Sequence, residues 1–306
     1  MGGAGTDDLD ATTGIALLAF LGHGETPASP EFGRTVEMGL NHLLASMTAT
    51  NSPVLKGRPP AFGHAITTWA VCEGYNLTQI VAMQPAVEKG LAVILKGQKP
   101  SGLWDGNYSP NGGGDDIDVS VWQVFALNSG LMMGSHEGLR GALSKASGAM
   151  KIVLGAKPDK GLLAGAVFCC QLCGEGQSPT CRSALNDLAT MTLDWKNPVY
   201  NDPFFRWYLT TQAFFHKGGE HWKRWNNLFV PQLVEHQIVA KEPKGQNIGY
   251  WDSPGGGELY GRVYATALSI LMLEVYQMPR YLPYFESPPS KSETNAPDKE
   301  IIIDVK

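Results

Sequence analysis

The sequence lacks any long apolar run. Its longest apolar stretches, such as Ala16 to Leu21 and Leu268 to Leu273, are far shorter than the roughly 18 residues that a membrane-spanning helix needs. No basic segment followed by an apolar one opens the chain, so the sequence as given shows no secretory signal peptide. We therefore expect a protein that is not embedded in a membrane.

The sequence also lacks an excess of positive charge, and it has few cysteines. Lysine and arginine number 24 against 29 aspartates and glutamates, which gives a net charge of -5 at pH 7. Nucleic acids are poor partners for such a chain, because their binding depends on basic side chains that displace counterions. The five cysteines are an odd number, and three of them fall within Cys169 to Cys173. This differs from the even framework of a disulfide-rich secreted domain and predicts buried thiols.

The sequence does contain an internal repeat. Apolar segments rich in small residues recur about every 50 residues, a period typical of repeated supersecondary units. Five of the six segments end at a glycine, which would stop a helix by adopting the left-handed conformation. The six predicted helices cover Gly14 to Gly24, His64 to Gly74, Ser120 to Gly130, Ala164 to Gly174, Tyr208 to Gly218 and Tyr264 to Glu274.

Amphipathic segments lie between these apolar ones, so each unit predicts a helix hairpin whose second helix covers the first. The chain is therefore predicted to be all-α. We expect six inner helices that close into a single α/α toroid over residues 11 to 286, with an open solenoid as the alternative. The five predicted outer helices cover Gly33 to Met47, Pro85 to Gly97, His136 to Leu154, Thr180 to Trp195 and Glu220 to Gln237.

One outer helix is missing from this count, because Pro279 and Pro283 interrupt the segment after the sixth inner helix. The sequence thus predicts an open groove, to be filled by a helix that precedes residue 11, by a partner or by a second copy. Residues 1 to 10 are expected to be disordered or a truncated start, and residues 287 to 306 a mostly disordered tail. Within that tail, only Ile301 to Ile303 resembles a strand.

Two segments resemble the QW motif of squalene and oxidosqualene cyclases, in which a glutamine at the end of an outer helix stacks on a following tryptophan. They comprise Gln98, Gly102 and Trp104, and, with a longer insert, Gln237, Gly249 and Trp251. With the sixfold period, the chain resembles the terpenoid cyclase and protein prenyltransferase superfamily of α/α toroids, in particular the bacterial prenyltransferase and squalene oxidase repeat proteins. Such repeat proteins often follow an export segment, so the location stays open: extracytoplasmic if such a segment was removed, cytoplasmic otherwise.

The resemblance implies chemistry at the start of the third inner helix. Class II cyclases protonate an alkene with an Asp-x-Asp-Asp motif there, and Asp116 and Asp118 match its first two acids, whereas Val119 replaces the third. We expect Asp118 to be the N-cap of the helix, with a role as general acid as the alternative. Prenyltransferases hold zinc on Asp, Cys and His; Asp116, Asp118 and Val263 stand at those positions, so the histidine is missing.

The predicted pore carries aromatic side chains with a few charges, a composition typical of a ligand site. Core packing is the competing interpretation for each aromatic residue. Arg262 is expected to pair with Asp118 or Glu258, because a charge inside the ring is costly unless it is paired. The candidate ligand-binding residues are His64, Trp122, Arg206, Trp207, Tyr208, Tyr260, Arg262 and Tyr264.

No metal or cofactor is predicted, although two alternatives stay open. Cys170 and Cys173 are spaced for zinc, which would need two further ligands. The loop 105–116 resembles a calcium loop, but Pro110 replaces the glycine of its turn.

The sequence therefore predicts a single-toroid repeat protein that binds an apolar, isoprenoid-like or extended ligand, or a protein partner, at its central cavity, without full cyclase or prenyltransferase activity. The alternatives are a minimal class II terpenoid cyclase that uses Asp118 as general acid, and a toroid enzyme that acts on polysaccharide. Whether the protein is an enzyme is left open.

Overall fold

The computed structural model describes residues 9–49, 60–134, 138–200, 202–241, 247–254 and 261–277. Helices dominate these ranges, as the sequence predicts, and none of the described helices is long and apolar enough to cross a membrane. In chain order the helices are α1 (Leu9–His23), α2 (Gly33–Ala49), α3 (Pro60–Thr78), α4 (Gln84–Gly97), α5 (Ile117–Met132), α6 (Leu139–Gly155), α7 (Lys160–Leu172), α8 (Pro179–Leu188), α9 (Pro203–Lys217), α10 (Gly219–Glu235) and α11 (Gly261–Leu273). Short 3-10 turns lie at Val81–Met83 and Glu274–Gln277.

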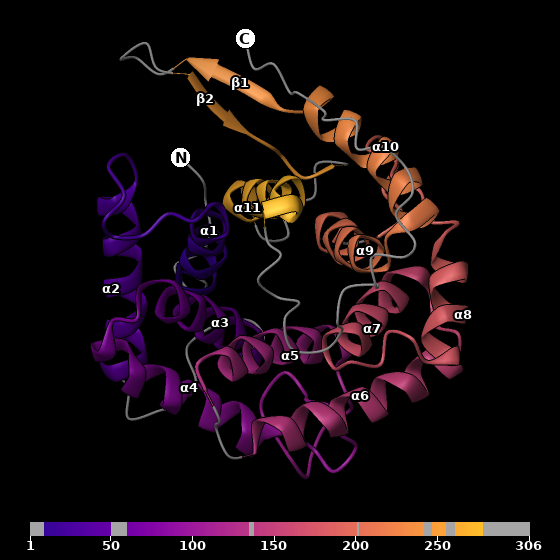
Figure 1. Ribbon diagram of the computed structural model, residues 1–306, viewed down its shortest axis with the longest axis horizontal. Helices are drawn as coiled ribbons and strands as arrows, with labels where there is room; N and C mark the ends of the chain where they lie inside the picture. Colours follow the sequence, from indigo (N-terminus) through magenta and orange to yellow (C-terminus); the bar gives the residue numbers. More distant parts are fainter. Residues whose placement is uncertain are drawn as a thin grey trace, which may run out of the picture.

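The odd-numbered helices form a closed cycle of contacts. Each of α1, α3, α5, α7 and α9 packs on the next odd-numbered helix, and α11 packs on both α9 and α1 (Figure 1). Such helices must be apolar on every face. In α3 every residue from Ala61 to Gly74 is buried, and in α5 every residue from Val119 to Leu131.

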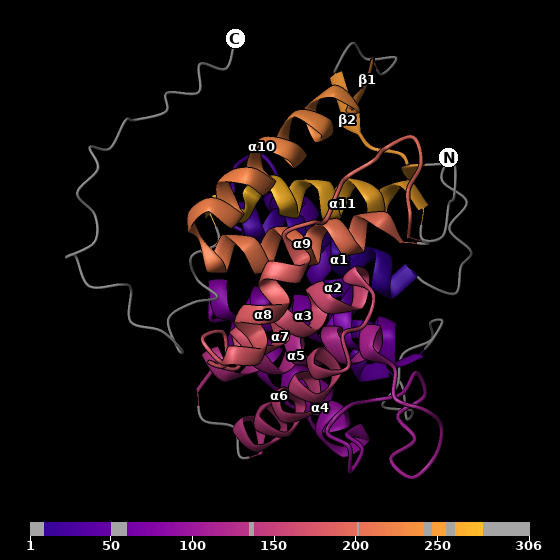
Figure 2. The ribbon, with the colours of Figure 1, turned by 90° about the vertical axis from the view of Figure 1, so that its right-hand side faces the viewer.

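The even-numbered helices lie outside this ring (Figures 1 and 2). Each of α2, α4, α6 and α8 contacts the two inner helices that it connects, and α10 packs on α9. Since each outer helix returns the chain to the start of the next inner helix, outer helices run antiparallel to inner ones. Among the described helices, none covers the gap between α11 and α1.

The glycines at the ends of the apolar segments serve two different purposes. Gly24 and Gly174 follow their helices with φ of 95° and 78°, as predicted for left-handed caps. Gly218 follows α9 with φ 67° but ψ -163°, which is not the left-handed helical conformation, so that prediction was wrong there. Gly74 and Gly130 instead lie inside longer helices, and the prediction was wrong for them. A Cβ at Gly74 would come within 2.6 Å of a leucine of α2, and one at Gly130 within 2.7 Å of a leucine of α4. Glycine here lets an outer helix pack closely.

One helix end and one hairpin also differ from the prediction. The helix expected to reach Trp195 ends at Leu188, and the Asp194 carboxylate then accepts hydrogen bonds from two backbone N–H groups in a turn. The chain also forms an antiparallel hairpin of β1 (Ile238–Lys241) and β2 (Asn247–Tyr250), which the sequence analysis missed. Residues 1–8, Ile301 to Ile303 and the rest of the tail lie outside the described residues.

Candidate functional site

The two QW-like segments make the same hydrogen bond. The indole N–H of Trp104 donates to the carbonyl of Ile94 at 2.7 Å, and that of Trp251 donates to the carbonyl of Leu233 at 2.7 Å. Each carbonyl lies four residues before the glutamine of its segment, in the last turns of an outer helix. Both tryptophans are buried, and their backbone N–H groups donate to the hydroxyls of Ser120 in α5 and Thr266 in α11. Each tryptophan therefore joins the end of an outer helix to the next inner helix.

The glutamines and glycines of these segments are in close contact with their surroundings. Gln98 donates through Nε2 to the carbonyls of Gly102 (2.9 Å) and Ala142 (2.8 Å). Gly102 has φ +94°, and a Cβ there would lie 2.5 Å from a backbone oxygen of α6. A Cβ at Gly249 would lie 2.8 Å from Nε2 of Gln237. Glycine is required at Gly102, where φ is positive and the nearest atom is backbone, whereas at Gly249 the contact is with the end of a flexible side chain.

The acidic residues before α5 have different roles from those predicted. Asp116, not Asp118, is the N-cap, since its carboxylate accepts the backbone N–H of Val119 at 3.0 Å. Asp118 instead forms a two-pronged ion pair with Arg206, with both N–O distances at 2.5 Å. The expected pairing of Asp118 with Arg262 was therefore wrong. Burial lowers the pKa of Arg206, but the hydrogen bond and charge of Asp118 outweigh it, so the pKa is raised.

A second carboxylate completes this group. Asp202 is the N-cap of α9: it accepts the backbone N–H of Phe205 at 3.1 Å and the hydroxyl of Tyr264 at 2.9 Å. Burial raises its pKa to about 6, although these two hydrogen bonds and the charge of Arg206 lower it. We name Asp118, Asp202, Arg206 and Tyr264 the mouth cluster, because they lie where α5, α9 and α11 begin.

Within the mouth cluster, the Asp118–Arg206 pair joins two helices, α5 and α9, that are not neighbours in the ring. Arg206 on α9 reaches Asp118 on α5 across the start of α7, where a Cβ at Gly161 would come within 3.0 Å of the arginine side chain. Beneath the cluster, Trp122 stacks on Phe205 with ring centroids 4.7 Å apart. This end of the ring centre is thus closed by side chains.

Deeper in the ring, the centre is also filled. The rings of Trp69, Phe125, Phe168 and Tyr208 pack together, with the Phe125 and Phe168 centroids 5.2 Å apart. The cavity that they line with Asn128, Leu172 and Gln212 measures only about 10 Å³. That volume leaves no room for an isoprenoid, so the expected binding cavity is not found at this level of the centre. Trp122 and Tyr208 are core residues here.

His64 is also part of the core. Its side chain is almost fully buried, and Nδ1 lies 2.8 Å from the hydroxyl of Tyr108, which donates to Oε1 of Gln123 at 2.9 Å. Burial lowers the pKa of His64 to about 4. The imidazole is therefore neutral near pH 7 and links α3 to α5 through the loop between them.

The remaining predicted ligand-binding residues are dispersed. Trp207 is buried against Trp195, with ring centroids 5.5 Å apart. Arg262 binds Asp252 at 2.7 Å and lies over the ring of Tyr250, 4.1 Å from its centroid. Tyr260 and Glu258 lie outside the described residues.

The residues considered as metal ligands are free thiols or accept backbone hydrogen bonds. No cluster of three or more potential metal ligands occurs in the described part of the chain. Cys170 and Cys173 are free thiols whose pKa values are raised mainly by burial. In the loop 105–116, the Asp105 carboxylate accepts the backbone N–H groups of Asn107 and Ser109, and Asp116 caps α5.

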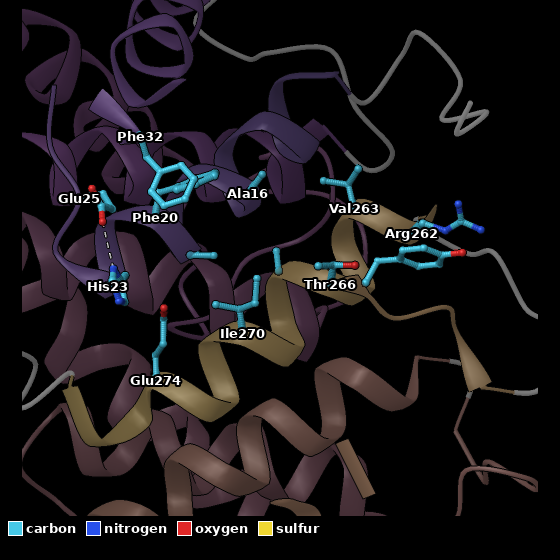
Figure 3. A pocket seen from close by; sticks show the side chains of 13 residues that line it. Ala16, Phe20, His23, Glu25, Phe32, Arg262, Val263, Thr266, Ile270 and Glu274 are labelled. Carbon is cyan, nitrogen blue, oxygen red and sulfur yellow. Dashed lines mark hydrogen bonds and ion pairs between the residues drawn. The ribbon is translucent and has the colours of Figure 1, made fainter. Parts of the chain in front are cut away.

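A large cavity lies between α1 and α11, on the outer side of the ring, where the count of outer helices predicts a groove (Figure 3). We call it the α1–α11 groove. Its volume is about 490 Å³. It is lined by Ala16, Ala19, Phe20, His23, Glu25, Phe32, Tyr250, Arg262, Val263, Thr266, Ala267, Ile270 and Glu274.

The groove is apolar in the middle and charged at its ends (Figure 3). At one end, His23 and Glu25 form a pair at 3.1 Å, and Glu274 points toward the groove from the other wall. Oε2 of Glu274 is buried and has no hydrogen-bond partner, and burial raises the pKa of this carboxyl to about 7 although His23 lowers it. Arg262 lies at the opposite end.

Comparison with known proteins does not assign the chain to a family. No protein-family model matches it, and no curated protein is significantly similar.

Proposed function

We propose that this protein is a binding protein of the α/α toroid type found in terpenoid cyclases and protein prenyltransferases, and that its binding site is the α1–α11 groove. The observation that carries the proposal is the contrast between the groove of about 490 Å³ and the central cavity of about 10 Å³. Apolar concave sites with a few polar groups at their edges are typical of ligand and partner sites. The matching hydrogen bonds of Trp104 and Trp251 support the toroid resemblance.

The contacts of Asp118 favour binding over the cyclase alternative. A general acid for alkene protonation needs a carboxyl oxygen within reach of the alkene. Both carboxylate oxygens of Asp118 instead accept hydrogen bonds from Arg206. If the protein were nevertheless a minimal cyclase, Asp118→Asn would abolish product formation from a polyprenyl substrate, which chromatography of the extracted lipids would detect.

The test of the groove uses Nile red, a neutral apolar dye whose fluorescence rises in apolar surroundings. Val263 is half-exposed on the groove wall, and Val263→Asp would place a carboxylate against the bound dye. We expect at least tenfold weaker dye binding, because burying an unpaired charge costs more than about 1.4 kcal/mol. Val234→Asp, at an exposed position of α10, is the matched control. Equal dye binding by both variants would refute the proposed site.

A further inference from the structure

The groove repeats a geometry that the ring shows elsewhere. Each of α2, α4, α6 and α8 lies in the depression between two neighbouring inner helices and runs antiparallel to them. The α1–α11 groove is the corresponding depression between the last inner helix and the first, and α1 contacts α11 along it. By shape alone, the object that fits this depression is another helix.

The walls of the groove suit a helix in size and chemistry. The small side chains of Ala16, Ala19 and Ala267 in the lining let a backbone approach closely, and Phe20 and Ile270 add larger apolar side chains. The walls are helices of 15 and 13 residues, or about 20 Å long at 1.5 Å per residue. A helix of about four turns with one apolar stripe matches this length.

The charges at the two ends give that helix a direction. Carboxylates stabilise a helix N-terminus, whose first N–H groups lack partners, and cations stabilise a C-terminus. Glu25 and Glu274 lie at the end where α1 and α11 finish, and Arg262 lies where α11 begins. A helix antiparallel to both would therefore place its N-terminus at the carboxylates. Its free N–H groups could satisfy the buried, unpartnered Oε2 of Glu274.

We infer that the α1–α11 groove binds one amphipathic α-helix of a partner polypeptide, antiparallel to α1 and α11, with its N-terminus at Glu274 and its C-terminus at Arg262. This inference rests on the proposed function and names the partner class for the same site.

The probe is a synthetic peptide with the sequence of residues 33–49, labelled with a fluorophore at its C-terminus. In the intact chain this segment is an outer helix, α2, whose Val36, Leu40, Leu43 and Met47 are buried against the ring. Arg34 near its start would lie close to Glu274 in the inferred orientation. Fluorescence anisotropy with the full chain should show saturable binding. A control peptide with Leu40→Asp and Leu43→Asp should not bind.

Two changes test the site and the orientation. Val263→Asp should weaken peptide binding at least tenfold, whereas Val234→Asp should leave it unchanged. Glu274→Gln in the protein and Arg34→Glu in the peptide should each weaken binding about threefold or more, and the second change should matter less once Glu274 is replaced. Glu220→Gln, on exposed α10, is the control for Glu274→Gln.

Several results would overturn the inference. If Nile red binds the groove but the peptide does not bind, the inference fails and the proposed function stands; if neither depends on Val263, both fail. Strictly additive effects of Glu274→Gln and Arg34→Glu would refute the orientation. Concentration-dependent dimers that Val263→Asp abolishes in analytical ultracentrifugation would identify a second copy, not a partner helix, as the occupant.

Discussion

The substitution Asp202→Asn tests the electrostatics of the mouth cluster. Asp202 is partly buried at the start of α9, where its carboxyl accepts the Phe205 N–H and the Tyr264 hydroxyl. Asparagine is about as good an N-cap as aspartate, and it is uncharged. The substitution therefore removes the cost of burying the charge while it keeps the cap.

The sign and size of the effect follow from the pKa of Asp202, which rises from 3.8 to about 6 on folding, chiefly through burial. Between pH 3.8 and about 6 the folded protein keeps the carboxyl proton of Asp202, whereas the unfolded chain loses it. The contribution of this group to the free energy of unfolding is therefore highest below pH 3.8 and falls as the pH rises through about 6. The shift corresponds to about 3 kcal/mol. Asp202→Asn should thus raise the free energy of unfolding at pH 8 by up to about that amount and change it little at pH 4.

Urea unfolding followed by tryptophan fluorescence at pH 4, 6 and 8 measures this difference. The buried His64 and the partly buried His216, whose pKa values are lowered to about 4, have the opposite pH dependence, but their contributions cancel between wild type and variant. Asp202→Ala is the control for the cap, and it should cost about 1 kcal/mol at pH 4. A difference between wild type and Asp202→Asn that does not change with pH, or a less stable variant at pH 8, would refute the reasoning.

Three further substitutions test the contacts that hold the ring, each by chemical denaturation. Asp118→Asn leaves a partly buried guanidinium without its charged partner and should cost about 1 to 2 kcal/mol after solvent screening, whereas Asp252→Asn, in a half-exposed pair, should cost less than about 1 kcal/mol. Trp104→Phe leaves a buried carbonyl unpaired and should cost about 1 to 3 kcal/mol. Gly90→Ala would place a methyl group 2.7 Å from neighbouring side chains and should lower the free energy of unfolding by about 1 to 3 kcal/mol. Its control is Gly141→Ala, in open space on α6, which should raise the free energy of unfolding by up to about 1 kcal/mol. Equal effects of the two substitutions would contradict the described packing.

The helices were predictable because their burial leaves a mark on the sequence. A helix that is buried on all sides must be mostly apolar, which is why α3 and α5 stand out as segments dominated by apolar and small residues, with only a few buried polar side chains such as His64 and Gln123. The open groove was predicted by counting, since Pro279 and Pro283 disfavour an outer helix after the sixth predicted inner helix. Both inferences depend on composition and order along the chain, which a sequence shows directly.

The contacts of single side chains were less predictable. Asp118 and Arg206 are 88 residues apart, and several charged residues stand near helix starts, so the sequence does not show which arginine reaches which carboxylate. Asp202 precedes Pro203, a sign of a helix start, yet its burial depends on how α9 and α11 pack. The hairpin of β1 and β2 was missed because it is short and mostly exposed, so it has little apolar periodicity.

The filled centre contrasts with the open groove. A ring of helices with an empty middle would lose the dispersion contacts of every side chain that faces the hole, and outer helices would have to supply the missing burial. Here Trp69, Trp122, Phe125 and Phe168 fill that space with rings in mutual contact. These rings come from α3, α5 and α7, whereas α1 and α11 pack directly on each other. The apolar surface left in the groove is available for a partner, whose binding would complete the sixth outer position.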